Sequence, residues 1–175
     1  MNVGREIKEI KMDEKIKIHI FPKVQFQEVL ERNNINDDNV DSIIKYAFIC
    51  INDSEGKYYH TPLFTQPHHN VLNLFFDDVK NDLEISPTNP GKTRAFTEED
   101  AKQVIKFLDK NKHIKVLLIH CAAGISRSGA IGQFALDYLN GDRDHFKINN
   151  KHILPNAEVL RILNNYIRKS SFRKK

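Results

Sequence analysis

The sequence predicts an α/β fold, a single domain in which a central, mostly parallel sheet is flanked by helices. A chain of 175 residues is long enough for one domain with a sizeable core. Strand-like apolar runs alternate with segments whose apolar residues recur at helical spacing, and this alternation is typical of parallel sheets covered by helices. A loop in which five residues separate a cysteine from an arginine joins the last of these strands to a helix.

The strands are expected at apolar runs that end in polar or turn-forming residues. The first run alternates in polarity, and the later runs are nearly continuous, as in strands buried on both faces. The predicted strands cover residues 16–21, 46–51, 71–76 and 116–119. Residues 84–92 are rich in Ser, Pro, Asn and Gly and are expected to form a loop.

The helices are expected between and after these strands. A capping box of Thr97 and Asp100 predicts a helix that runs to about Lys110. The pair Asn140-Gly141 predicts a left-handed end to the helix that follows the cysteine loop. Further helices are expected after Pro22, over 41–45, and after the pair Pro155-Asn156, whereas residues 146–153 are ambiguous.

The loop from His120 to Ser128 carries the strongest functional signal. Cys121 stands at the tip of a buried strand, and Arg127 falls in the first turn of the next helix. A helix N-terminus carries about half a positive charge and unpaired N–H groups. Gly124 permits the loop to curl so that these amides converge on one point. The amides and the guanidinium therefore favour the thiolate form of Cys121 and suit a phosphate oxyanion.

The run His-Cys-x-x-Gly-x-Ser-Arg-Ser, residues 120–128, resembles the signature of the cysteine-dependent protein tyrosine phosphatases. The order of elements is similar to the compact dual-specificity branch of that family. The resemblance covers about residues 45–168, is strongest at 116–136 and is weakest before 45. It implies a phosphatase domain over residues 1–168, followed by a basic tail at 169–175.

The resemblance also implies a mechanism that needs no metal or other cofactor. Cys121 attacks phosphorus to form a phosphocysteine, Arg127 holds phosphate oxygens, and Ser128 assists release of the thiolate. The implied phosphate-binding residues are Ala122, Ala123, Gly124, Ile125, Ser126 and Arg127. The alternative is a buried strand cysteine that precedes an unrelated surface arginine.

In this family an aspartate on the loop before the long helix protonates the leaving oxygen. Asp77 and Asp78 follow the strand at 71–76 and precede Cys121 by 44 and 43 residues, more than is usual in small relatives. An insertion at 84–95 accounts for the excess. The register favours Asp78 as the acid, with Asp77 shaping the loop, and Asp82 is a more distant candidate. The alternative is that both aspartates only end the strand and have no catalytic role.

The implied activity is removal of phosphate from phosphotyrosine in a protein or peptide, with phosphoserine and phosphothreonine as further substrates. RNA 5′-triphosphatases and phosphoinositide phosphatases use the same loop and remain alternatives. Residues 122–125 lack the lysines that meet extra inositol phosphates, which disfavours a phosphoinositide. A non-enzymatic phospho-binding module would lack at least one of the Cys, Arg and Asp, and this sequence has all three. Sulfurtransferase and arsenate reductase chemistry does not require the Ser-Arg-Ser ending.

Composition places the chain in a reducing, cytoplasmic setting. No run approaches the roughly 20 apolar residues that span a bilayer, and the first residues lack the apolar core of a secretion signal. Two cysteines among many lysines do not suggest a disulfide framework. Five basic residues in 168–175 exceed the whole net charge of +4, so a solvated tail is favoured over a nucleic-acid surface. The sequence does not indicate an oligomeric state.

His120 and Cys50 each have two possible interpretations, and a group of histidines raises the question of a metal site. His120 either fixes the loop through backbone hydrogen bonds or is a bystander. Cys50 either traps an oxidised Cys121 as a disulfide or, as we favour, is a small buried apolar residue. A metal site is not favoured because no cysteine or carboxylate pair stands at ligand spacing from the three histidines of this region, His60, His68 and His69.

Overall fold

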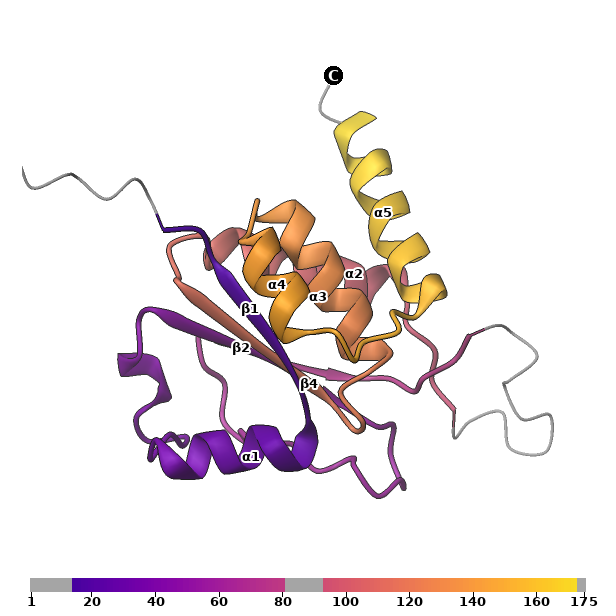
Figure 1. Ribbon diagram of the computed structural model, residues 1–175. Coiled ribbons are helices and arrows are strands. Elements are labelled where there is room, and N and C mark those ends of the chain that lie inside the picture. The colour runs from indigo at the N-terminus through magenta and orange to yellow at the C-terminus, as the bar shows by residue number, and fades with distance from the viewer. Residues whose placement is uncertain (1–13, 81–92, 173–175) are drawn as a thin grey trace, which may run out of the picture.

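The computed structural model describes residues 14–80 and 93–172. Within them the predicted strands are present as β1 (Lys17–Pro22), β2 (Tyr46–Asn52), β3 (Val71–Phe75) and β4 (Val116–Cys121). They form one sheet in the order β1-β4-β2-β3, and every neighbouring pair runs parallel. The expected single-domain α/β class with a parallel sheet is therefore confirmed (Figure 1).

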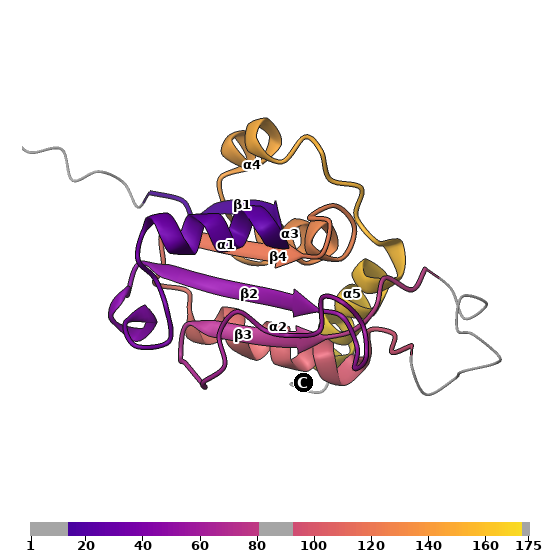
Figure 2. The same cartoon turned by 90° about the horizontal axis from the view of Figure 1, so that it is seen from below.

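Helices cover both faces of the sheet (Figure 1, Figure 2). One face carries α2 (Glu98–Lys110), α3 (Arg127–Tyr138) and α5 (Ala157–Phe172), with α4 (Arg143–Asn149) beside β1. The other face carries α1 (Lys23–Arg32) and a 3₁₀ turn, η1 (Val40–Ser42). Within the described ranges, no helix is both long and apolar enough to cross a bilayer.

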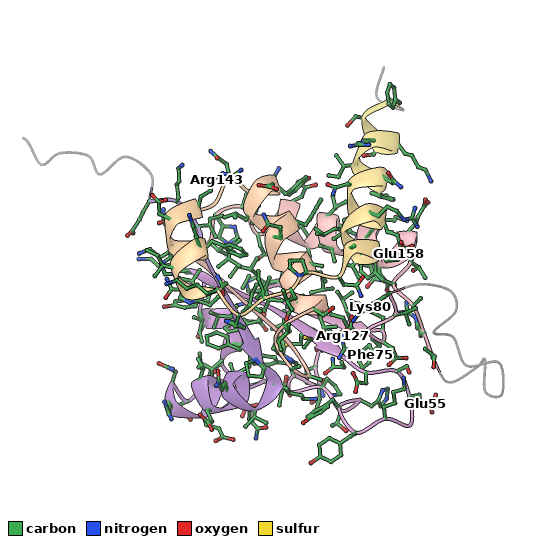
Figure 3. All side chains as sticks on the ribbon, turned by 45° about the vertical axis from the view of Figure 1, so that its right-hand side comes forward. Glu55, Phe75, Lys80, Arg127, Arg143 and Glu158 are labelled. Atoms are coloured by element: carbon green, nitrogen blue, oxygen red, sulfur yellow. The ribbon has the colours of Figure 1, made fainter. Side chains whose placement is uncertain are left out.

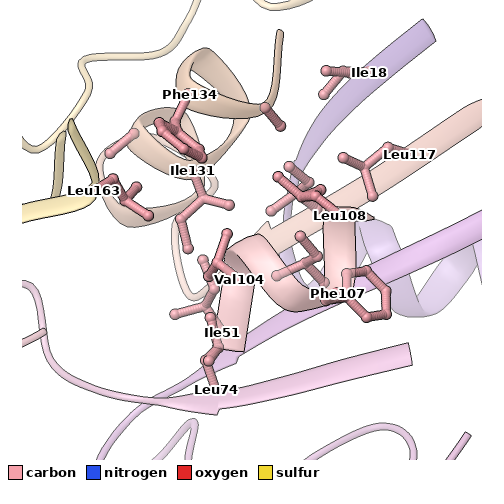
Figure 4. Close-up of a cluster of buried hydrophobic side chains, with 14 of the residues drawn as sticks. Ile18, Ile51, Leu74, Val104, Phe107, Leu108, Leu117, Ile131, Phe134 and Leu163 are labelled. Atoms are coloured by element: carbon pink, nitrogen blue, oxygen red, sulfur yellow. The ribbon is translucent and has the colours of Figure 1, made fainter. Parts of the chain in front are cut away.

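Two apolar layers hold the helices to the sheet, because successive strand side chains point to opposite faces. The larger layer lies under α2, α3 and α5 and takes side chains from all four strands (Figure 4). The smaller layer lies under α1 and includes Phe26, Phe48 and Cys50. Burial of a large apolar side chain contributes roughly 1.5–3 kcal/mol, so these layers fix the strands that carry the site. Members of the larger layer labelled in Figure 4 include Ile18, Ile51, Leu74, Val104, Leu108, Leu117, Ile131 and Leu163.

Local signals set some of the helix ends. Thr97 and Asp100 form the predicted capping box at α2, each side chain accepting from the other residue's backbone N–H. After α3 the left-handed residue is Asn140, with φ of 49°, and not the glycine that follows it. The helix expected at 41–45 is instead the three-residue turn η1, and the ambiguous stretch 146–153 contains the end of α4.

The last helix runs past the domain boundary expected at residue 168. It begins after Asn156, as predicted, and reaches Phe172, so residues 169–172 of the expected tail are helical. Residues 173–175 lie outside the described residues, as does the loop expected at 84–92. The division into a domain and a tail stays a prediction.

The carboxyl ends of β2, β3 and β4 meet at one edge of the sheet. Because β2 lies between β3 and β4, the segments that follow these three strands are neighbours. They begin at Asp53, Phe76 and Ala122. Parallel sheets bind ligands at this edge, and the candidate residues collect there.

Candidate active site

The cysteine loop holds its sulfur atom with two hydrogen-bonding groups. Cys121 ends β4 and is 2% exposed. The backbone N–H of Gly124 donates to Cys121 Sγ at 3.2 Å, and Ser128 Oγ lies 3.1 Å from the same atom. Hydrogen bonds of this kind stabilise a sulfur anion relative to the neutral thiol. Three residues predicted as part of one site are thus in contact.

Gly124 also lets the loop sit directly on the end of β1. Its φ is 67°, a left-handed conformation that side chains disfavour. A Cβ at this position would lie 2.2 Å from Pro22 N and 2.3 Å from the Phe21 carbonyl carbon. Lys23 N donates to Ala122 O at 3.2 Å beside this contact. The sequence predicted the glycine's freedom but not this close approach.

Arg127 is fixed from the side of β2 and β3. It is the first residue of α3 and is 6% exposed. Its Nη1 donates to Asp53 Oδ1 and to Phe76 O, both at 2.7 Å. A guanidinium has five N–H donors, so its other donors remain for an anion. Sequence reasoning missed Asp53 and saw only a turn there, although an acid directly after a strand that neighbours the cysteine strand was an available signal.

Asp77 is occupied by structural contacts. It is buried, and its carboxylate accepts from Ser54 N, Ser54 Oγ and Arg94 N at 3.2, 2.5 and 2.8 Å. Lys57 Nζ lies 2.9 Å from the same carboxylate. Burial alone would raise the pKa of Asp77, but the hydrogen bonds from these groups lower it overall. The predicted role of Asp77 in shaping the loop agrees with these contacts.

Asp78 faces the cavity that Cys121 and Arg127 line. Its Oδ1 accepts from Ser126 Oγ and from Asn156 Nδ2, both at 2.7 Å. The two adjacent aspartates thus have different surroundings, and only Asp78 borders this cavity. Asp82, the more distant candidate, lies outside the described residues.

The cavity has a volume of about 500 Å³ and a mixed lining. The cysteine loop lines it from Cys121 to Arg127, except for Gly124. Lys80 also lines it and lies near Arg127 in Figure 3. Another wall is formed by residues 154–157, which sequence reasoning did not assign to the site. Leu154 N donates to Ile125 O at 3.1 Å, which ties this wall to the loop.

His120 is neutral and packs against an aromatic ring. Burial first, and then the charge of Lys23, lower its pKa to about 3. Neither ring nitrogen has a hydrogen-bond partner within the described residues. The ring centroid lies 4.6 Å from that of Phe26. Packing against Phe26 holds the ring, and its predicted role in fixing the loop stays a prediction.

Cys50 points away from the candidate nucleophile. In the β2–β4 register Cys50 lies opposite His120, and its side chain joins the layer under α1. Cys121 joins the layer on the other face of the sheet. Burial raises the pKa of the Cys50 thiol. These contacts favour the packing interpretation over the disulfide trap.

His60, His68 and His69 contact carboxylates or a backbone oxygen. His68 Nε2 and Nδ1 contact Asp37 and Asp41 at 2.9 and 2.7 Å, and His69 Nδ1 contacts Asp41 at 2.7 Å. His60 Nδ1 lies 3.0 Å from a backbone oxygen, that of residue 53. Across residues 14–80 and 93–172, no group of three or more His, Cys, Asp or Glu side chains is arranged to hold a metal ion.

Comparison with known proteins finds no family model and no curated protein that matches the chain. Among solved structures, the Cydia pomonella PTP-2 phosphatase matches with a TM-score of 0.48 and 13% identity over 85% of this chain and 84% of that one. PTPMT1 in complex with PI(5)P gives 0.47 and 13% over 91% and 95%.

The human tyrosine phosphatase-like serine/threonine/tyrosine-interacting protein gives a TM-score of 0.43 and 22% identity over 88% of this chain and 93% of that one. The names of these three structures include a phosphatase and a tyrosine phosphatase-like protein. Each of these three TM-scores is below 0.5, so the likeness carries no conclusion about the chemistry of this chain.

Proposed function

We propose that this protein is a cysteine-dependent phosphomonoesterase. The observation that carries the proposal is one cavity that brings together Cys121, Arg127 and Asp78, although Asp78 precedes Cys121 by 43 positions. A nucleophile, an anion holder and an acid are the three groups that transfer of a phosphoryl group to a thiolate requires.

In the first step the Cys121 thiolate attacks phosphorus. The S–P bond forms as the bond from phosphorus to the leaving oxygen breaks, and that oxygen takes the proton of the Asp78 carboxylic acid. The bonds from Gly124 N–H and Ser128 Oγ stabilise the thiolate before attack. A positioned acid typically contributes 10²–10⁴-fold to such a step.

In the second step water hydrolyses the phosphocysteine. The Asp78 carboxylate accepts a proton from water as the oxygen attacks phosphorus, the S–P bond breaks, and the sulfur leaves as a thiolate. Ser128 Oγ, 3.1 Å from Sγ, donates to the departing sulfur. The acid of the first step thus becomes the base of the second, and the enzyme returns to its starting state.

Arg127 and the loop amides hold the equatorial phosphate oxygens through both steps. Asp53 and the Phe76 carbonyl orient the guanidinium before substrate arrives, so little reorganisation is needed at the transition state. Fixed donors aimed at developing charge are usually the largest contribution to such catalysis.

We propose phosphotyrosine in a protein or peptide as the preferred substrate, with phosphoserine and phosphothreonine as slower ones. Ile125 and Leu154 border the cavity with exposed apolar side chains, and Pro155 extends that wall. An aromatic ring bound there would bury apolar area that a serine phosphate cannot. A reducing compartment, which the thiolate requires, remains the predicted location.

The test is a panel of substrates assayed with a chelator present: phosphotyrosine peptide, phosphoserine peptide, phosphoinositide and 5′-triphosphate RNA. We expect the phosphotyrosine peptide to be hydrolysed fastest and Cys121→Ser to abolish release. A faster reaction with phosphoinositide or RNA would reassign the substrate. Phosphopeptide binding without hydrolysis would instead identify a binding module and refute the proposal.

The role of Asp78 is tested by the leaving group. Asp78→Asn is expected to slow hydrolysis of phenyl phosphate, whose leaving group needs a proton, by about 10²-fold or more. Hydrolysis of a fluorinated umbelliferyl phosphate, whose leaving group is stable as an anion, should change far less. Equal losses on both substrates would refute the assignment. Asp77→Asn, which disturbs a loop contact instead, should not discriminate between the two.

A further inference from the structure

Asn156 is a buried side chain that joins three parts of the site. It is 3% exposed and lies directly before α5. Its Oδ1 accepts from Glu158 N and Val159 N at 3.0 and 3.1 Å and so caps that helix. Its backbone N–H donates to Ser126 O at 3.1 Å. Figure 3 shows the start of this helix, at Glu158, beside Lys80 and Arg127.

The amide nitrogen of the same side chain is directed at the candidate acid. Asn156 Nδ2 donates to Asp78 Oδ1 at 2.7 Å and to Val79 O at 3.1 Å. Because Oδ1 must accept from two backbone N–H groups of α5, the amide can turn only its nitrogen toward the carboxyl. All hydrogen-bonding capacity of this buried amide is used, which is the condition under which a buried polar side chain rigidifies its surroundings.

We propose that Asn156 is the positioning residue of Asp78, an inference that rests on the proposed function. Ser126 Oγ and Asn156 Nδ2 both donate to Oδ1 of the carboxyl, and no donor within the described residues contacts Oδ2. The proton of the carboxylic acid is therefore held on Oδ2. Asn156 thus determines that Oδ2 of Asp78 carries the proton. It also fixes the orientation of this carboxyl relative to α5, which packs against α2 and α3.

The competing explanation is that Asn156 only caps the helix. The two roles use different atoms of the side chain, so substitution separates them. Asn156→Ser keeps a capping oxygen, since serine is as good an N-cap as asparagine, but its short side chain loses the donor to Asp78. Asp142, which caps α4 by accepting from His145 N at 2.9 Å, provides the control. Asp142→Ala removes a cap that has no contact with Asp78.

We expect Asn156→Ser to lower kcat/KM for phenyl phosphate by about 10-fold or more, a part of the 10²–10⁴-fold that the acid supplies. The value for a fluorinated umbelliferyl phosphate should stay within about twofold. Asp142→Ala should affect both substrates alike. In the Asp78→Asn background, Asn156→Ser should have no further effect on phenyl phosphate, because the group it positions is already gone. Equal losses on both substrates, or additive losses in the double variant, would overturn the inference.

A second variant covers the case in which serine destabilises the fold. Asn156→Asp keeps the capping oxygen and places a carboxyl next to Asp78. Like charges disfavour ionisation, so the alkaline limb of the kcat/KM profile should move to higher pH. An unmoved limb in a folded variant would contradict the inference. Failure of the proposed function looks different, because wild-type phosphate release would then be absent or would survive Cys121→Ser.

Discussion

Replacement of Gly124 by alanine perturbs the geometry of the cysteine loop most directly. A left-handed conformation costs a non-glycine residue about 1–2 kcal/mol. The added Cβ would also lie 2.2 Å from Pro22 N, where ordinary contacts begin at 3.4 Å. The neighbour is backbone and cannot rotate away, so loop and strand must separate by about 1 Å. A misplacement of this size can cost roughly 100-fold in rate.

Gly56 offers a matched control for this variant. It has a φ of 81°, yet a Cβ there would meet nothing within 4 Å. Gly56→Ala should therefore lose about 1–2 kcal/mol of stability and keep its activity, while Gly124→Ala loses about 100-fold in kcat/KM. Steady-state assays with a fluorinated umbelliferyl phosphate and thermal unfolding of both variants give the comparison. If Gly124→Ala kept activity within about twofold of Gly56→Ala, the proposed dependence on loop geometry would be wrong.

Three further predictions concern residues around the site and the sheet. Asp53→Asn should weaken inhibition by inorganic phosphate and lower kcat/KM by about tenfold or more, because a hydrogen bond to the charged Arg127 contributes roughly 1.5–3 kcal/mol; unchanged values of both would contradict this. Burial lowers the pKa of His68, but its two aspartate partners raise it overall, so its contribution to stability is complete below about pH 6.5 and is lost as pH rises through the raised value. Thermal unfolding at pH 6 and pH 9 should show a larger loss for wild type than for His68→Gln, and equal losses would refute the linkage. Peroxide treatment followed by non-reducing peptide mapping should give no disulfide between Cys50 and Cys121, and finding one would overturn the opposite-face arrangement.

The parts of the fold that the sequence predicts are those governed by local patterns. Strand periodicity, the capping box at Thr97 and the start of the last helix depend on residues a few positions apart. The cysteine loop is local too, because one run of nine residues supplies the strand end, the turn glycine and the helix start. Even the position of the left-handed residue after α3 is predicted to within one residue.

The contacts that complete the site lie far apart in the sequence. Asp53 reaches Arg127 across 74 positions, and Asn156 reaches Asp78 across 78. Residue periodicity does not predict such contacts, because the strand order and the path of the chain after α4 bring these residues together. For the pair Asp77 and Asp78, the sequence register favours Asp78 as the acid but does not predict the contacts that distinguish the two. Their local sequence is nearly symmetrical, and they differ because Ser54 and Arg94 surround one while Ser126 and Asn156 hold the other.

The most direct test of the account is the pH dependence of Cys121 alkylation by iodoacetamide, followed by peptide mapping to separate it from Cys50. We expect Cys121 to react at pH 6 far faster than a free cysteine, and inorganic phosphate to protect it by occupying the loop. Arg127→Ala should abolish that protection. A reaction that becomes appreciable only at about pH 8.5 is typical of an ordinary thiol. Such a pH dependence, without any slowing by phosphate, would contradict the proposed thiolate in an anion-binding loop.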